Sequence, residues 1–134
     1  MRSVNIVNEL VARDRVLGTL AKEAIECSEE KKNMAALACL FILVEQAVKF
    51  ALNRTEGNFY RLLKTAKEKK LLENEDFSIL NRLREIRNRL FHETHYAWFY
   101  EKNGISYPFS EDETKKEIFD DFSGKCFEIV LELL

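Results

Sequence analysis

Apolar residues recur every three or four positions along most of the chain, the spacing of one face of an α-helix. From residue 4 to 29 this spacing predicts a first long helix, although Asp14 falls within the apolar stripe and interrupts it. The polar residues 28–33 predict a turn, and a second helix is expected over about 33–53. That second helix is apolar on nearly every side as far as Glu45, which is typical of the central helix of a bundle.

Turn-forming residues end the second helix and begin the third. The segment 53–58 predicts a break, with Gly57 in the left-handed αL conformation and Asn58 as the N-cap of the next helix. Helical spacing then resumes and predicts a third helix over about 59–72 and a fourth over about 76–94.

The last third of the chain adds a hairpin and a final helix. Asn103-Gly104 lies between aromatic and β-branched residues, which predicts a tight β-hairpin. Ser110 and Glu113 are spaced as a capping box, which would open a last helix running to the C-terminus. The pattern as a whole predicts an all-α protein, an up-and-down bundle of about five helices with a small β-hairpin inserted before the last helix.

Composition agrees with a single globular domain over residues 1–134. Apolar residues make up 46% of the chain and charged residues 33%, with four Gly and one Pro, a balance typical of helix-rich globular proteins. A length of 134 residues is enough to bury a core, and we find no internal repeat and no linker that would divide the chain.

Charge is unevenly distributed although the net charge is only −2. Residues 49–89 hold eleven Lys and Arg against six acids, whereas residues 101–134 hold nine acids against four Lys. A polyanionic partner would therefore meet the middle of the chain. The lysines at 64, 67, 69 and 70 are interpreted first as a solvated face, and otherwise as a surface that guides phosphate to the neighbouring helix.

The cysteines and the apolar run favour a soluble, cytoplasmic protein without a membrane partner. Cys27, Cys39 and Cys126 are an odd number without CxxC spacing, and Cys39 lies in an apolar run where a buried thiol is expected. The longest uncharged run, residues 33–44, has twelve residues, which is too short to span a bilayer and indicates a buried core helix.

The candidate chemistry lies on the fourth predicted helix, where the stretch 83–95 (LREIRNRLFHETH) holds three arginines and both histidines. On a helical wheel one narrow polar ridge forms on this helix, made of Asn81, Arg84, Asn88, His92 and His95. Arg87 instead falls within the apolar sector. Because a guanidinium is costly to bury unpaired, Arg87 is expected to face an anion, either the Glu45 carboxylate or a phosphate.

The histidines allow three interpretations. A surface or cap position is the most common place for one histidine near a helix end. His92 and His95 at i and i+3 suggest a metal, but HETH is not HExxH and no third ligand has a recognisable spacing, so no metal is expected. The third interpretation joins His92 to Arg87 and Asn88 as one catalytic group.

Arg87, Asn88 and His92 resemble the R-N-x-x-x-H signature of the HEPN domain (higher eukaryotes and prokaryotes nucleotide-binding). Glu45 in "LVEQAVKFAL" is similar to a Glu on the central helix of that family. The resemblance implies a metal-independent endoribonuclease without cofactor, a toxin or phage-defence effector. It also implies a homodimer in which two such segments meet in a composite cleft.

The residue types suit RNA cleavage. Imidazole titrates near neutral pH, so His92 would serve as general base or acid for the 2′-OH. Arg87 would stabilise the charge of the phosphorane, and Asn88 would orient the imidazole or the phosphate. Arg84, Glu45 and His95 are expected to support the site or to bind substrate.

Two features depart from a simple carry-over of the family. Arg87 and His92 lie about 140° apart on an ideal helical wheel, so either the helix unwinds near His92 or the two side chains converge across the dimer axis. Family members silenced by a nucleotidyltransferase antitoxin often have Tyr two residues after the His. Here that position is Thr94 and the nearest tyrosine is Tyr96, which counts against control by modification of this tyrosine. The expected antitoxin partner is therefore nucleotidyltransferase-like or of another type.

Two other interpretations remain open. One is a non-catalytic module that binds a nucleotide, RNA or protein through the same fold and ridge. The other is a dimerisation bundle in which Arg87 forms a structural ion pair. The aromatic residues of segment 96–109 are interpreted first as a hairpin that covers the end of the bundle or a dimer interface, and otherwise as a platform for stacking bases.

Overall fold

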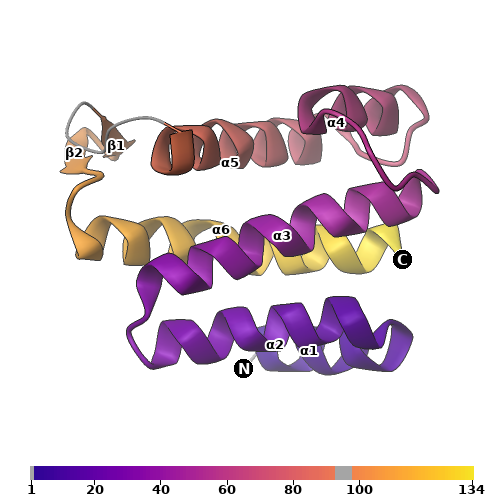
Figure 1. The fold of residues 1–134 in the computed structure, drawn as a ribbon, viewed down its shortest axis with the longest axis horizontal. Coiled ribbons are helices and arrows are strands. Elements are labelled where there is room, and N and C mark those ends of the chain that lie inside the picture. The colour runs from indigo at the N-terminus through magenta and orange to yellow at the C-terminus, as the bar shows by residue number, and fades with distance from the viewer. Residues whose placement is uncertain (1, 93–97) are drawn as a thin grey trace.

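The chain folds as an all-α bundle that carries one small β-hairpin before its last helix (Figure 1). The computed structural model describes residues 2–92 and 98–134, and of residues 2–4 and 92 it describes the backbone only. In chain order the described elements are α1 (Arg2–Arg13), α2 (Arg15–Glu29), α3 (Asn33–Ala51), α4 (Phe59–Glu68), α5 (Asn74–His92), β1 (Phe99–Lys102), β2 (Ile105–Pro108) and α6 (Asp112–Leu133). The predicted fold class is confirmed.

The prediction of one first helix over residues 4–29 is wrong, because the chain breaks at Asp14 and forms α1 and α2. Asp14 has extended backbone angles (φ −149°, ψ 111°), and its side chain accepts a hydrogen bond of 3.0 Å from the Leu17 amide, which caps α2. Gly18 lies against α1 so closely that a Cβ there would meet the Val11 Cα at 2.4 Å. The described bundle therefore has six helices rather than about five.

Helix α3 is the centre of the bundle, as predicted. In Figure 1, α1 and α2 lie on one side of α3 and α6, and α4 and α5 lie on the other. Leu37, Leu40 and Leu43 of α3 are fully buried, and α6 contributes the buried Phe127 and Ile129 to the same core. Burying an aliphatic side chain of this size stabilises the fold by about 1.5–3 kcal/mol, so this layer holds α4 and α5 in place.

By length and composition alone, α3 could cross a membrane, since the helix has 19 residues and extends beyond the twelve-residue uncharged run. About 44% of its most apolar stretch is buried inside the fold, and the core helix of a soluble protein meets the same criteria. Its burial against α2 and α6 therefore agrees with the predicted core helix.

The turn predictions are confirmed in part. Asn58 caps α4 by accepting a hydrogen bond of 3.2 Å from the Arg61 amide. Gly57 has a positive φ of 139°, but the residue in the αL conformation is Asn53, with φ 54°, just after α3.

The hairpin and the last helix form as predicted, but the predicted cap of that helix is wrong. Asn103 and Gly104 have φ angles of 51° and 77°, and Lys102 pairs with Ile105 across the turn, as expected for Asn-Gly in a two-residue hairpin. The predicted capping box of Ser110 and Glu113 is wrong, because α6 begins one residue later. Glu111 is its N-cap and makes no side-chain capping bond.

The cysteine prediction also needs correction. Cys39 is only partly buried, although burial raises the pKa of its thiol, whereas Cys126 of α6 is fully buried and its pKa is raised to about 12 by that burial. Cys126 is thus the thiol that packs as a small hydrophobe.

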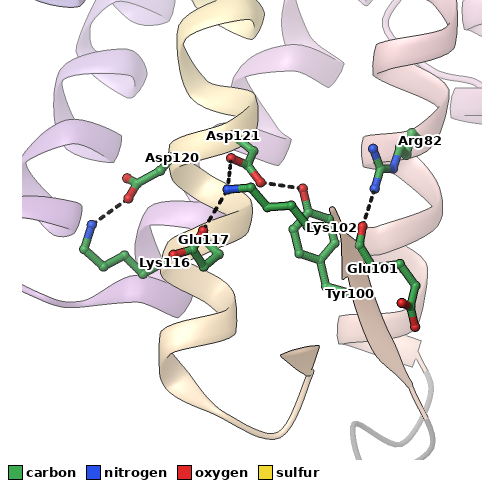
Figure 2. Close-up of polar contacts among 8 residues, drawn as sticks. All are labelled: Arg82, Tyr100, Glu101, Lys102, Lys116, Glu117, Asp120 and Asp121. Atoms are coloured by element: carbon green, nitrogen blue, oxygen red, sulfur yellow. Dashed lines mark hydrogen bonds and ion pairs between the residues drawn. The ribbon is translucent and has the colours of Figure 1, made fainter. Parts of the chain in front are cut away.

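A polar cluster holds the hairpin on α6 (Figure 2), and we call Tyr100, Lys102, Glu117 and Asp121 the hairpin clamp. The Tyr100 hydroxyl donates to Asp121 Oδ2 at 2.8 Å. Lys102 Nζ donates to Asp121 Oδ1 at 2.8 Å and to Glu117 Oε2 at 2.9 Å. On the other side, Arg82 of α5 donates to the Glu101 carbonyl at 3.2 Å, so the hairpin bridges α5 and α6.

Candidate functional site

Arg87 of α5 faces a carboxylate, as one of the two predicted alternatives required. Its Nη1 donates to Glu45 Oε2 of α3 at 2.9 Å, and its Nη2 donates to Asn88 Oδ1 at 3.4 Å. The guanidinium carbon lies 5.5 Å from the centre of the Phe59 ring. Among the described residues, Arg87 Nε is buried without a hydrogen-bond partner. Arg87 is therefore oriented on several sides and still keeps one donor unused.

Glu45 is shared between two cations. Lys49 Nζ, one turn further along α3, lies 3.2 Å from Glu45 Oε1. The side chains of Lys49, Arg87 and Glu45 are 17%, 22% and 26% exposed, so all three are partly shielded and none is sealed from solvent. We call Glu45, Lys49, Arg87 and Asn88 the arginine centre. Its two cations and one anion leave a surplus positive charge, which favours a further anion.

The polar ridge predicted on α5 is present as far as Asn88. Arg84 Nε donates to Asn81 Oδ1 at 2.9 Å, and its guanidinium lies 4.9 Å from the centre of the Tyr60 ring. Asn81, Arg84 and Asn88 are all partly exposed. Of the supporting residues, Arg84 thus belongs to the polar ridge of α5, and Glu45 pairs with Arg87 from α3.

The histidines of the candidate site lie outside this description. His92 ends α5, and its side chain is not among the described groups, while His95, Thr94 and Tyr96 belong to the undescribed segment 93–97. Within the described residues there is no group of three His, Cys, Asp or Glu side chains that could hold a metal ion. The side chains of His92 and His95, on which the metal interpretation depends, lie outside those residues.

A groove lies between α4 and α5, which the sequence pattern did not predict although it marked the lysines of α4 as a possible surface for phosphate. The cavity has a volume of about 820 Å³ and is lined on its basic and aromatic side by Tyr60, Lys64, Lys67, Lys70 and Phe77, which we call the basic–aromatic groove. The spacing of Tyr60 and Lys64, four residues apart on α4, was a local signal for part of it. Phe77 is on another helix, and only the packing of α4 on α5 brings it to Lys67.

The hairpin covers the end of the bundle, as was favoured for the aromatic segment. Tyr100 and Phe109 are 4% and 1% exposed, and Trp98 lies under the guanidinium of Arg89, with 4.1 Å from that group to the ring centre. Phe99 is exposed. Tyr96 lies outside the described residues.

Comparisons of the chain with protein-family models, with curated proteins and with solved structures found no match. The likeness to HEPN domains therefore rests on Arg87, Asn88, His92 and Glu45 and on the order of the helices.

Proposed function

We propose that this protein is a metal-independent endoribonuclease of the HEPN type, acting in the cytoplasm as a toxin or phage-defence effector. The observation that carries the proposal is the arginine centre. Arg87 lies five residues before His92 on one helix, is oriented by Glu45 and Asn88, and has a surplus positive charge beside it from Lys49. A guanidinium held in place before substrate arrives is what stabilisation of a phosphorane requires.

The reaction assigns one role to each group. His92 takes the proton of the RNA 2′-OH, whose oxygen attacks the adjacent phosphorus. The bond from phosphorus to the 5′-oxygen then breaks, and that oxygen takes a proton from a second imidazole or from water, which leaves a 2′,3′-cyclic phosphate and a 5′-hydroxyl. Arg87 stabilises the extra charge on the phosphorane oxygens, and Asn88 orients the phosphate.

A homodimer is part of the proposal, because apolar side chains are exposed on α3 and α5, the two helices that carry the arginine centre. Ile42 and Phe50 of α3 are 48% and 57% exposed, and Phe91 of α5 is 45% exposed with its ring edge-on to Phe41 at 5.6 Å. A second copy seated on this face would cover them and bring two α5 ends together. Convergence of Arg87 and His92 across that axis would also overcome their separation of about 140° on one helix.

The test is cleavage of RNA by the purified protein with EDTA present. We expect the wild type to cut, His92→Ala to lose at least 100-fold in rate, and His95→Ala to lose much less, because His95 has only a supporting role. If the wild type cuts none of a panel of structured and single-stranded RNAs, the ribonuclease proposal fails. If cleavage stops on chelation, a metal mechanism replaces the one proposed.

A non-catalytic binding module is the second candidate, favoured by the direct 2.9 Å contact of Arg87 with Glu45. In that case the pair ties α5 to α3 and the surplus charge serves only to bind RNA, a nucleotide or an acidic partner. RNA binding by the wild type without cleavage would select this function. An antitoxin, of nucleotidyltransferase or other type, is a partner of the first candidate, and co-purification of the product of the adjacent reading frame would identify it.

A further inference from the structure

We propose that the basic–aromatic groove between α4 and α5 is a binding site for single-stranded RNA and leads the strand to the arginine centre. The lysines would take phosphates, and the Tyr60 ring would stack on a base. The delivery of the strand to the arginine centre for cleavage rests on the proposed function, whereas binding of RNA in the groove can be measured without cleavage.

The groove is large enough and has the charge for a nucleic acid strand. Its volume of about 820 Å³ accommodates more than one nucleotide, and Lys64, Lys67 and Lys70 line it against two acids, Glu68 and Glu73. Lysines on one rim track a phosphate backbone through charge alone, without a requirement for sequence.

Aromatic rings are interleaved with these cations. Lys64 Nζ lies 5.6 Å from the centre of the Tyr60 ring, and Lys67 Nζ lies 4.7 Å from the centre of the Phe77 ring. Tyr60 is 40% exposed, so its ring can be reached by a ligand, and a stacked base would take the place of Lys64 or Arg84 over that ring. A ring beside an ammonium matches a nucleotide, in which a flat base is joined to a phosphate.

The contacts continue from the groove to the arginine centre. Tyr60 is contacted by Lys64 from α4 and by Arg84 from α5, at 5.6 Å and 4.9 Å. The preceding residue, Phe59, is buried, and the centre of its ring lies 5.5 Å from the Arg87 guanidinium. Along α5, Phe77 and Arg84 are two turns apart, about 10 Å, and Arg87 follows within the next turn. A strand lying along α4 and α5 (Figure 1) would therefore pass from lysine to lysine and arrive at Arg87.

An acidic protein segment is the competing occupant, and the tyrosine distinguishes it from RNA. Carboxylates would pair with the lysines but gain little from a flat ring between them. A base gains stacking energy from Tyr60, since base–aromatic stacking tolerates any sequence. The interleaved rings therefore favour RNA.

Binding is measured by fluorescence anisotropy with a labelled single-stranded RNA that is 2′-O-methylated throughout, so that attack by the 2′-oxygen is blocked. The groove variant is Lys64→Ala with Lys67→Ala, and the matched control removes two exposed cations of α2, Arg15→Ala with Lys22→Ala. Helix α2 lies across the bundle from α4 (Figure 1). We expect at least a tenfold loss of affinity for the groove variant at moderate salt and less than twofold for the control.

The salt dependence and the tyrosine sharpen the test. Loss of two phosphate contacts should reduce the slope of log K against log salt by about 1.4, at about 0.7 for each phosphate of a single strand. Tyr60→Ala should weaken binding about 5- to 20-fold, which is within the range for loss of one base–aromatic stack, whose upper limit is about 150-fold. Tyr60→Phe keeps the ring and should bind as the wild type does. Circular dichroism confirms that each variant is folded.

Three results would overturn the inference: no binding by the wild type at low salt, equal losses in the groove and control variants, or tighter binding of polyglutamate than of RNA without any dependence on Tyr60. Failure of the ribonuclease proposal gives a different result, because the groove would then bind RNA while the wild type cut none. Cleavage with no effect of the groove variants would leave the ribonuclease and remove the groove.

Discussion

The arginine centre and the hairpin clamp are built from the same kinds of group but carry opposite surplus charge. In the clamp, Lys102 is bound by two carboxylates, Asp121 and Glu117, and the Tyr100 hydroxyl donates to the other oxygen of Asp121. In the arginine centre, Arg87 and Lys49 share the one carboxylate of Glu45.

The difference indicates which cluster can accept a phosphate. The clamp has one more acid than base, so it repels anions, and its contacts join the hairpin to α6 (Figure 2). The arginine centre has one more base than acid and its side chains are partly exposed, so it can add an anionic ligand. We therefore expect changes in the arginine centre to alter RNA cleavage and changes in the hairpin clamp to alter folding stability.

The largest expected effect is on catalysis. Arg87→Ala should lower the single-turnover rate of RNA cleavage about 100- to 1,000-fold, the loss typical of one donor to a transition-state oxyanion. Asp121→Asn in the clamp should stay within about threefold of the wild type, because it contacts no proposed catalytic group. Equal losses in the two variants, measured where both are folded, would contradict the contrast between the clusters.

The next effect is on folding stability. Asp121→Ala removes the acceptor of both Tyr100 and Lys102 and leaves the largely buried tyrosine hydroxyl without its bond, so the free energy of unfolding in urea should fall by about 2–3 kcal/mol. Glu117→Ala is the matched change, and its more exposed pair should cost at most about 1 kcal/mol. A larger loss for Glu117→Ala would mean that Asp121 is not the centre of the clamp.

Glu45→Gln should separate the structural from the binding role of the arginine centre. The variant keeps the shape of the side chain but removes the charge that pairs with Arg87, so the unfolding free energy should fall by about 1–2 kcal/mol. RNA affinity at low salt should rise, because the carboxylate no longer competes with phosphate. A fall in affinity in anisotropy titrations of the folded variant would show that Glu45 helps binding.

The smallest effect is on the pH dependence of the folding stability, to which the clamp contributes through Tyr100 and Lys102. Burial and the bond to Asp121 raise the pKa of Tyr100 to about 12, and the two carboxylates raise the pKa of Lys102. Both groups are protonated in the folded state at pH values where the unfolded chain already loses the proton. The stability they contribute is therefore complete below about pH 10 and declines as the pH rises toward 12.

Tyr100→Phe is the variant for this test. Thermal unfolding followed between pH 9 and 12 should show a steep decline for the wild type and a shallower one for the variant, which lacks the contribution of Tyr100 and keeps those of Lys102 and of the buried Cys126 thiol. Identical slopes would mean that Tyr100 does not titrate as its contacts indicate. The cleavage variants of Arg87 should have the wild-type slope.

Local patterns in the sequence predicted the helices over most of their lengths, the Asn103-Gly104 hairpin and the inward position of Arg87 with Glu45 opposite. These features depend on spacing along one helix or on the φ angles that one dipeptide favours. The predicted capping box at Ser110 is wrong although its pattern is local, because α6 begins one residue later and has Glu111 as its N-cap.

Only the tertiary structure decided where the chain breaks and which distant groups meet. Asp14 interrupts the apolar stripe, but the stripe resumes after it because α1 and α2 both turn an apolar face toward the same core, so the pattern was compatible with one long helix. The hairpin clamp and the basic–aromatic groove join residues from different elements, such as Tyr100 with Asp121 and Lys67 with Phe77. Periodicity gives the face of each helix but not the neighbour on which that face packs, and this neighbour determines both the charge balance and the ligand that each cluster can accept.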